Sequence, residues 1–401
     1  MEEKISPARL QTRAVHAGDR KPLEGFIPVT TPIYTASSFI YKDVEQLDKV
    51  FGREVEGPSY SRYRNPTNDA LEELMASLES GAGSLACSSG MAALQVALQV
   101  ALTDRRKSIV AAQSLYGASI SLLGKVFDPM GVNVKFVDFC DMDAVNKAVI
   151  DHKPGAMLME TITNPLLRVA EVDRIAQLAK SAGAALIVDN TFATPLIMRP
   201  IEIGASFVVH SLTKYLAGHG DVLGGIVVAD EENLEPLRAY SRIVGPVLGP
   251  FESYMSMRGI KTFPLRMERQ CANACRVASA LAANPAIEKV YYPRDPKHPD
   301  VEAVKRLFSP DLYGAMVSFE LKDAGREQVF RFMNALNMVV PATSLGDVHS
   351  MVLYPSMASH REVSPKHRER MGIRDNLVRL SVGIEAAEDI IADLEHALRH
   401  D

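Results

Sequence analysis

A lysine follows two hydroxyl-bearing residues at the end of an apolar stretch, in the segment Val208-Val209-His210-Ser211-Leu212-Thr213-Lys214. An amine held there by a buried scaffold is partly desolvated, which lowers its pKa and makes it available for a Schiff base. The hydroxyls of Ser211 and Thr213 are spaced to meet phosphate oxygens. Most lysines that follow a strand are ordinary solvated side chains, so this interpretation depends on the rest of the chain.

Small or polar residues also follow three other apolar runs. A small-residue turn with Gly90 and Met91 opens a helical pattern, and it suits either a phosphate or a plain helix cap. Asp189 follows Leu186-Ile187-Val188, and because a buried acid is costly, it must either cap a helix or pair with a basic group. Asn164 stands before a proline, which favours an extended backbone.

The elements that would position these residues alternate between short apolar runs and helical patterns. The runs span residues 84–87, 108–112, 132–137, 157–159, 185–188, 207–209 and 225–229. This alternation predicts an α/β fold with a mostly parallel sheet that is covered on both faces. In such sheets the chemistry lies beyond the carboxyl ends of the strands.

The chain divides into three predicted parts. Residues 1–62 show little periodicity and several breakers, so we expect an arm that lies on another surface. Residues 63–257 form the large α/β domain. For residues 258–401 we predict a smaller α+β domain. Its helical patterns lie at 264–284, 326–336 and 389–399, and its predicted strands lie at 288–292, 315–321, 339–342 and 377–382.

Composition restricts the classes of partner. The 401 residues carry 44 Lys and Arg against 49 Asp and Glu, a net charge of −5, with no long basic run. We therefore expect a small-molecule partner, with neither nucleic acid nor a membrane. No stretch resembles a signal peptide or a membrane span, which predicts a cytoplasmic protein. Four cysteines are too sparse for a disulfide framework, and for Cys271 and Cys275 a buried helix face is favoured over a metal pair, so no metal site is expected.

Taken together, the motifs resemble the pyridoxal-phosphate (PLP) enzymes of cysteine and methionine metabolism. The resemblance runs from Thr12-Arg13-Ala14-Val15-His16 to Arg379-Leu380-Ser381-Val382-Gly383 and is highly specific. It points to the γ-subfamily of cystathionine γ-lyase, cystathionine γ-synthase, methionine γ-lyase and O-acetylhomoserine sulfhydrylase. It implies the PLP-dependent transferase fold of type I, with 63–257 as the PLP-binding domain.

The resemblance assigns roles to single residues. Lys214 matches the Schiff-base lysine, and Asp189 matches the acid that keeps the pyridine nitrogen protonated. Tyr116 matches the tyrosine that stacks on the ring and handles protons, although alone it would be read as a half-buried core aromatic. Five further residues match positions that contact the phosphate or the phenolic oxygen of the cofactor: Gly90, Met91, Ser211, Thr213 and Asn164.

Two further matches concern the partner subunit and the substrate. Tyr60 and Arg62 match a pair that reaches the phosphate from a neighbouring subunit, so the resemblance implies a dimer, usually paired into a homotetramer. Arg379, with Ser344 beside it, matches the site of the substrate α-carboxylate. The planar fork of an arginine suits that carboxylate, although Arg379 alone would be read as a surface ion pair.

The implied reaction begins with the Lys214 amine, which takes the α-proton of an amino acid and later a β-proton, while Tyr116 or Lys214 handles the proton of the leaving group. Completion by water gives an α-keto acid, ammonia and the leaving group. Addition of a thiol gives γ-replacement instead.

Substrate choice depends on the distal pocket. Ser59, Ser121 and His349 stand where cystathionine-specific relatives carry charged residues, which favours methionine or an O-acyl-homoserine. Methionine γ-lyases differ too: they carry a Cys at the position of Ala118 and a Lys-Asp pair at Ser241 and Arg242. Arg242 is either a distal cation or, as we favour, a solvated side chain.

We therefore predict γ-elimination of the methionine γ-lyase kind, on L-methionine or a related thioether, with cystathionine or homocysteine as further substrates. The alternative is γ-replacement on an O-acyl-homoserine. An aminotransferase of fold type I would need Lys214 and Asp189 but would not explain Tyr60, Arg62 or Tyr116. A catalytically silent binding protein conflicts with the retention of every cofactor contact.

Overall fold

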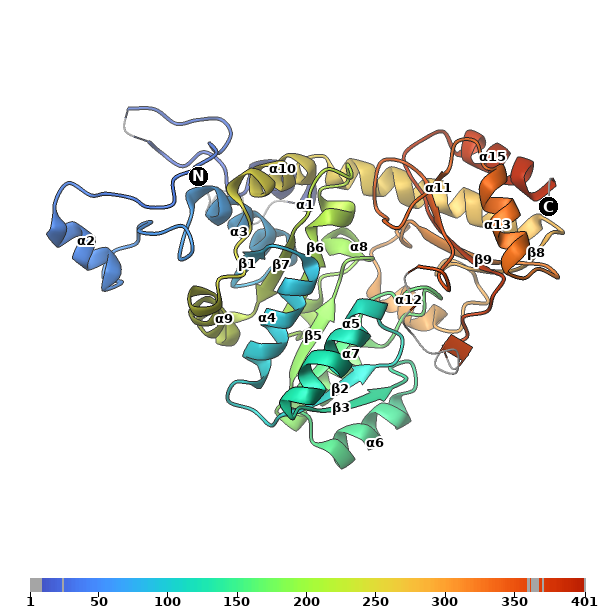
Figure 1. The fold of residues 1–401 in the computed structure, drawn as a ribbon, viewed down its shortest axis with the longest axis horizontal. Helices are drawn as coiled ribbons and strands as arrows, with labels where there is room; N and C mark the ends of the chain where they lie inside the picture. The colour runs from blue at the N-terminus through green and yellow to red at the C-terminus, as the bar shows by residue number, and fades with distance from the viewer. Residues whose placement is uncertain (1–8, 24, 359–360, 362–367, 370, 400–401) are drawn as a thin grey trace.

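The computed structural model describes residues 9–23, 25–358, 361, 368–369 and 371–399 (Figure 1). A seven-stranded sheet forms its larger part, in the order β1-β7-β6-β5-β4-β2-β3. The strands are β1 Gly83–Cys87, β2 Ser108–Ala112, β3 Asn133–Val137, β4 Ala156–Glu160, β5 Ala185–Asp189, β6 Phe207–Ser211 and β7 Gly225–Ala229. All seven predicted runs are strands, with ends that differ by at most two residues.

The sheet is mostly parallel, as predicted. Only β7 runs antiparallel to its neighbours, β1 and β6. Every residue of β1, β2, β4 and β7 is buried. Because successive residues of a strand point to opposite faces, this burial means that both faces of the sheet are covered.

Helices cover this sheet and enclose its core. They are α3 Pro66–Glu79, α4 Gly90–Leu102, α5 Gly117–Leu122, α6 Met142–His152, α7 Val172–Ala182, α8 Thr194–Ile197, α9 Glu231–Val244 and α10 Pro250–Ile260. The start of α3 follows from its sequence, because the Asn65 side chain accepts a hydrogen bond from the N–H of Thr67 and Pro66 occupies the first turn.

A second sheet of five strands forms the smaller part, in the order β10-β11-β12-β9-β8. Its strands are β8 Ile287–Tyr291, β9 Met316–Leu321, β10 Val340–Pro341, β11 Met351–Leu353 and β12 Leu377–Ser381. Its helices are α11 Phe263–Ala283, α12 Val301–Leu307, α13 Arg326–Ala335 and α15 Ala387–Arg399. The short β11 and α12 were not predicted. We propose that the domain boundary lies at α10, close to residue 257.

The N-terminal arm is more regular than its sequence pattern predicts. It contains α1 Leu10–His16 and α2 Val44–Phe51, and the Asp43 side chain caps α2 by accepting a hydrogen bond from the N–H of Gln46. Figure 1 shows α2 standing away from the body of the molecule. Ile40 is 95% exposed and Val44 75% exposed, so this part of the arm leaves apolar surface uncovered. None of the described helices is long and apolar enough to cross a membrane.

Candidate active site

Three parallel strands end side by side, and each end carries a polar residue. Glu160, the last residue of β4, pairs in register with Asp189, the last residue of β5. Strand β6 runs parallel beside β5 and ends at Ser211. The sheet thus gathers two carboxyls and a hydroxyl along one edge, where an open α/β sheet forms its binding crevice.

Lys214 lies in a π-helical turn, Leu212–Leu216, that directly follows β6. Its φ of −93° and ψ of −138° depart from helical values. The Nζ atom donates a hydrogen bond of 3.0 Å to Oγ of Ser344, which belongs to the smaller part of the chain. Burial, aided by the nearby charge of Arg379, lowers the pKa of the Lys214 amine to about 8. The neutral, nucleophilic amine is therefore more abundant near neutral pH than in a solvated lysine.

Asp189 is fixed by Thr191. The backbone N–H of Thr191 donates to Oδ1 of Asp189 across 3.0 Å, and the Thr191 hydroxyl donates to the same oxygen across 2.6 Å. Among the described residues, no hydrogen bond reaches Oδ2. Burial raises the pKa of Asp189, against the effect of the Thr191 bonds and of His210. A cationic N–H donor facing Oδ2 would offset the cost of burying this carboxylate.

The N-terminus of α4 faces Ser211. The Ser89 side chain accepts from the N–H of Ala92, which leaves the first N–H groups of the helix, at Gly90 and Met91, without intrahelical partners. A Cβ at Gly90 would lie 3.0 Å from Cβ of Ser211, so a glycine permits this close approach. Unpaired N–H groups and the positive end of the helix dipole form a site for an anion such as a phosphate.

Thr213 makes two hydrogen bonds with the backbone of Gly224. Its hydroxyl donates to the carbonyl of Gly224 across 3.3 Å and accepts from the N–H of Gly224 across 3.1 Å. Ser211 is tied to the neighbouring strand end, because its N–H donates to the Thr191 hydroxyl across 3.0 Å. The predicted phosphate positions therefore lie together, and Thr191 links them to Asp189.

Arg379, in β12, carries a buried guanidinium with spare donor capacity. Its Nη1 donates to Oδ1 of Asn164 across 2.9 Å, and its Nε is buried without a hydrogen-bond partner among the described residues. Burial lowers its pKa to about 10, with Tyr215, Tyr116 and Glu160 acting in the opposite direction. An orphaned donor on a buried cation is costly, so the site is prepared for an anion such as a carboxylate.

Glu160 connects two of the predicted site residues and was missed by the sequence argument. Its Oε1 accepts the N–H of Tyr116 across 2.6 Å, and its Oε2 accepts the N–H of Asn164 across 3.2 Å. Burial, and secondarily the charge of Asp189, raises the pKa of Glu160 well above its ordinary value. One buried carboxyl therefore holds the backbone on both sides of the crevice.

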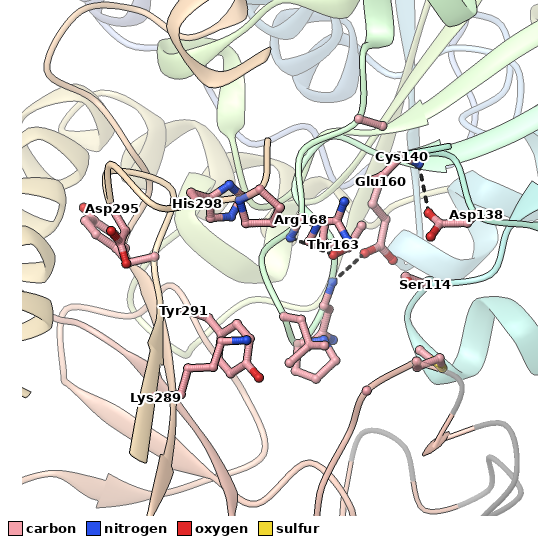
Figure 2. A pocket seen from close by; sticks show the side chains of 18 of the residues that line it. Ser114, Asp138, Cys140, Glu160, Thr163, Arg168, Lys289, Tyr291, Asp295 and His298 are labelled. Atoms are coloured by element: carbon pink, nitrogen blue, oxygen red, sulfur yellow. Dashed lines mark hydrogen bonds between the residues drawn. The ribbon is translucent and has the colours of Figure 1, made fainter. Parts of the chain in front are cut away.

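Glu160 also lies in the wall of a cavity of about 710 Å³ between the two sheets. Figure 2 shows Lys289 and Tyr291, from β8, across this cavity from Glu160. The crevice and the cavity thus share a wall. The Asn164–Pro165 peptide bond in this wall is cis.

Tyr116 stands at the crevice with its side chain free to meet a ligand. It precedes α5, and it is 42% exposed. Its phenol lies close enough to affect the pKa of Arg379. Tyr116 is therefore an exposed aromatic at the mouth of a polar crevice and not the half-buried core residue of the alternative interpretation.

Tyr60 and Arg62 contact one another and the end of α9. Arg62 donates to the carbonyl of Arg242, and its guanidinium stacks on the rings of Tyr60, at 5.6 Å, and Tyr63, at 4.6 Å. Tyr60 is 41% exposed. Among the described residues, no hydrogen bond or ion pair joins Tyr60 or Arg62 to Gly90 or Ser211.

The residues considered for substrate choice occupy varied positions. Ser59 belongs to the arm, and Ala118 and Ser121 belong to α5. Arg242, in α9, donates to Glu235 across 3.2 and 3.3 Å, and its side chain is 24% exposed. The side chain of His349 is 65% exposed, and its Nδ1 lies 3.2 Å from Oδ1 of the buried Asp347.

Thr191 and Glu160 were not predicted as site residues, because the local sequence around each gives only a weak signal. Thr191 follows an acid at a strand end, and an Asp with a hydroxyl two residues later often forms a local hydrogen-bonded turn. Glu160 ends a predicted strand just as Asp189 does. Its partner Tyr116 lies 44 positions away, however, so no short motif predicts the contact.

The whole chain matches known proteins. The family model described as Cys/Met metabolism PLP-dependent enzyme matches residues 11–399. The L-methionine γ-lyase of Fusobacterium nucleatum subsp. polymorphum is 41% identical over 392 residues, which cover 97% of this chain and 98% of that protein. The O-succinylhomoserine sulfhydrylase of Pseudomonas aeruginosa is 36% identical over 400 residues, which cover 99% and 97%.

Solved structures agree in fold. A crystal structure of cystathionine γ-lyase from Lactobacillus plantarum, complexed with L-serine, matches with a TM-score of 0.90. The two chains are 34% identical in sequence, and the match covers 98% of this chain and 99% of the other.

Proposed function

Because the chain belongs to the Cys/Met metabolism family of PLP-dependent enzymes, we propose that it catalyses γ-elimination on L-methionine or a related thioether. The products would be α-ketobutyrate, ammonia and a thiol. The similarity to an L-methionine γ-lyase along nearly the whole chain supports this substrate class. The uncharged side chains at Ser59 and Ser121 support it too, because the far end of cystathionine would find neither the Glu nor the arginine that cystathionine-specific relatives carry at these positions.

The residues at the crevice fit pyridoxal phosphate. The N–H groups of Gly90 and Met91 and the hydroxyls of Ser211 and Thr213 would hold its phosphate. Oδ2 of Asp189 would accept from the protonated ring nitrogen, Asn164 would meet the phenolic oxygen, Tyr116 would stack on the ring, and Lys214 would be the point of covalent attachment. When bound, the cofactor supplies an electron sink for the charge left by loss of the α-proton.

The observation that carries the proposal is the arrangement of two donors around the Lys214 amine. Arg379 offers an unpartnered Nε, and Ser344 lies 3.0 Å from Nζ of Lys214. Arg379 would bind the α-carboxylate of an amino acid, with Ser344 beside it, which leaves the Cα–H bond near Nζ. The lowered pKa of Lys214 makes its Nζ the base that takes the proton.

The proton of the leaving group would be supplied by Tyr116 or by Lys214. The Tyr116 side chain is exposed at the crevice, and Glu160 fixes its backbone. A phenol held in this way can donate to the leaving sulfur without moving its main chain.

The arm supports a shared active site. Among the described residues, Tyr60 and Arg62 make no hydrogen bond to the other predicted phosphate positions of their own chain, although the resemblance places them at the cofactor phosphate. We propose that they reach the crevice of a second copy in a homodimer, and that two dimers form a tetramer. The exposed Ile40 and Val44 give the arm an apolar surface to bury against such a partner. Four free cysteines support a reducing, cytoplasmic location.

The second candidate function is γ-replacement on an O-acyl-homoserine. The similarity to an O-succinylhomoserine sulfhydrylase at 36% identity favours it, because both reactions use the same cofactor-binding residues.

One assay separates the two functions. Purified enzyme is given methionine, homocysteine, cystathionine or O-acetylhomoserine, each with and without sulfide. α-Ketobutyrate formed from methionine without sulfide supports elimination. A new thiol or thioether that forms from O-acetylhomoserine only when sulfide is added supports replacement, and no turnover of any of the four would contradict both.

A further inference from the structure

Backbone from two other segments packs closely against the turn that carries Lys214 and against Ala217, which follows it. A glycine stands at each approach, Gly259 in α10 and Gly346 in the loop that carries Ser344. A Cβ at Gly346 would lie 2.6 Å from the backbone nitrogen of Tyr215, and a Cβ at Gly259 would overlap the carbonyl of Ala217. The conformation of the turn is therefore set by close contact on two sides.

The buried side chain of Arg266 donates hydrogen bonds to backbone carbonyl groups of this turn. Nη1 of Arg266, in α11, donates to the carbonyl of Tyr215 across 2.8 Å. Its Nη2 donates to the carbonyls of Leu216, across 3.0 Å, and Gly259, across 2.9 Å. A Cβ at Gly218 would overlap the guanidinium, so this position must be a glycine for Arg266 to reach the turn.

The cost of burying Arg266 is offset by these carbonyls and by Asp347. Arg266 is only 6% exposed. Burial lowers its pKa to about 10, and the charge of Asp347 acts in the opposite direction. Asp347 lies in the same loop as Ser344, and the next N–H in this loop, at Val348, donates to the carbonyl of Gly218 across 3.0 Å. This hydrogen bond joins the loop that carries Ser344 to the segment that directly follows the lysine turn.

We propose that Arg266 is a positioning residue for the reactive amine: by holding the carbonyls of Tyr215 and Leu216, it keeps Nζ of Lys214 beside Ser344 and away from solvent. Arg266 does not touch Lys214 itself and acts through the backbone of the turn. The inference rests on the role proposed above for Lys214. The charged group that faces Nζ is Arg379, and the other group within reach is the hydroxyl of Ser344.

The test compares holoenzymes by the pH midpoint of the cofactor's visible absorbance, which reports protonation at the Lys214 nitrogen. In the Arg266→Met variant the turn loses its two hydrogen bonds to Arg266 and the bond from Arg266 to α10 is also lost, so the nitrogen moves toward solvent and away from Arg379. Both changes favour the protonated form. We expect the midpoint to rise by about one pH unit, a tenfold change in proton affinity, and kcat to fall by about 100-fold through misplacement of the amine.

Two further variants decide between positioning and general loss of stability. Arg266→Lys keeps a cation that can meet one carbonyl, so we expect a smaller rise of the midpoint. Arg168→Met is the matched control, because Arg168 forms a two-bond ion pair with Asp300, at 2.6 and 2.8 Å, away from the lysine turn. This control should lower the melting temperature and leave the midpoint unchanged.

The outcomes separate this inference from the proposed function. A wild-type midpoint in Arg266→Met, or an equal shift in Arg168→Met, overturns the positioning role. If Arg266→Met does not fold, an unshifted midpoint in Arg266→Lys overturns it. Failure of the proposed function would appear elsewhere, as a cofactor absorbance that survives the Lys214→Ala substitution.

Discussion

Nη1 of Arg379 donates a hydrogen bond of 2.9 Å to Oδ1 of Asn164, and this bond joins the two sheets. Arg379 belongs to β12 of the smaller sheet, and Asn164 follows β4 of the larger one. The N–H of Asn164 donates to Glu160, so the buried cation is connected to a carboxyl at the edge of the opposite sheet. The binding of a substrate carboxylate by Arg379 would therefore depend on the relative position of the two sheets.

Arg379→Lys should weaken the binding of every amino-acid substrate. A lysine keeps the charge but loses the planar fork that can bond Asn164 and a carboxylate together. Loss of one charge-assisted hydrogen bond costs about 2 kcal/mol, which predicts a drop of about 30-fold in kcat/KM. Arg374→Lys is the control, because Arg374 pairs with Glu288 at the surface. Equal kcat/KM in the Arg379→Lys variant and the wild type would refute the carboxylate site.

Lys214→Ala should abolish both covalent attachment and proton removal. The variant lacks the only atom proposed to bond the cofactor, so we expect the visible absorbance of the bound cofactor to be lost and turnover to fall below detection. Absorbance spectra of the purified protein check this. Lys289→Ala, which removes a lysine stacked over Tyr291 at 4.5 Å, should keep both properties.

The pH profile of kcat should follow the Lys214 amine. Its pKa is lowered to about 8 by burial, so the protonated amine dominates below that pH and the neutral amine above it. We expect kcat to rise with pH through about 8, with a slope of about tenfold per pH unit on the acid side. Steady-state rates at saturating methionine measure the profile. A rate that falls with rising pH across this range would exclude a neutral amine as the base.

Glu160→Gln should change how stability depends on pH. The pKa of Glu160 is raised in the folded state, so its contribution to stability is complete below the ordinary value of 4.5 and is lost as pH rises through the folded value. The variant does not titrate there. We therefore expect the melting temperature of the wild type to fall relative to the variant between mildly acidic and alkaline pH.

The same Glu160→Gln variant should lose activity, because an amide nitrogen cannot accept the N–H of Tyr116 or Asn164. Glu388→Gln serves as the control for both measurements, since Glu388 forms an exposed pair with Arg276. A melting-temperature difference between wild type and Glu160→Gln that stays constant with pH would show that Glu160 does not titrate as its burial suggests.

A mixture of two inactive variants should regain activity if the active site is shared. Arg62→Ala removes the proposed phosphate contact, and Lys214→Ala removes the amine. In a mixed dimer with contribution across the interface, one site keeps both residues and the other loses both. Equal mixing after dissociation should therefore restore on the order of a quarter of wild-type activity. No restoration, with mixed dimers shown by mass spectrometry, would place Arg62 in the site of its own chain.

Much of the site could be predicted from the sequence, since it depends on strand ends. Asp189 and Ser211 each follow a short apolar run, and parallel strands place such residues along one edge. Lys214 was placed by the same reasoning. Glu160 and Arg266 were not predicted, because their partners lie 44 and 51 positions away, and no periodicity encodes contacts at such separations.

Parts of the fold escaped prediction for a related reason. Strand β11 has only three residues, which is too short for an alternation pattern, and its antiparallel partner, β12, is distant in sequence. Helix α2 is two turns long in a segment rich in breakers, so its cap at Asp43 was not recognised as the start of an element.

The bond between Arg379 and Asn164 also limits how this enzyme can be rebuilt by recombination with a relative. A chimera that exchanges the chain at α10 joins two halves taken from different proteins. The proposed carboxylate pocket lies at the junction between these halves, because Asn164 comes from the first and Arg379 from the second. Such hybrids will retain their cofactor more readily than their substrate, because the groups proposed to hold the phosphate and the ring nitrogen all come from the first half.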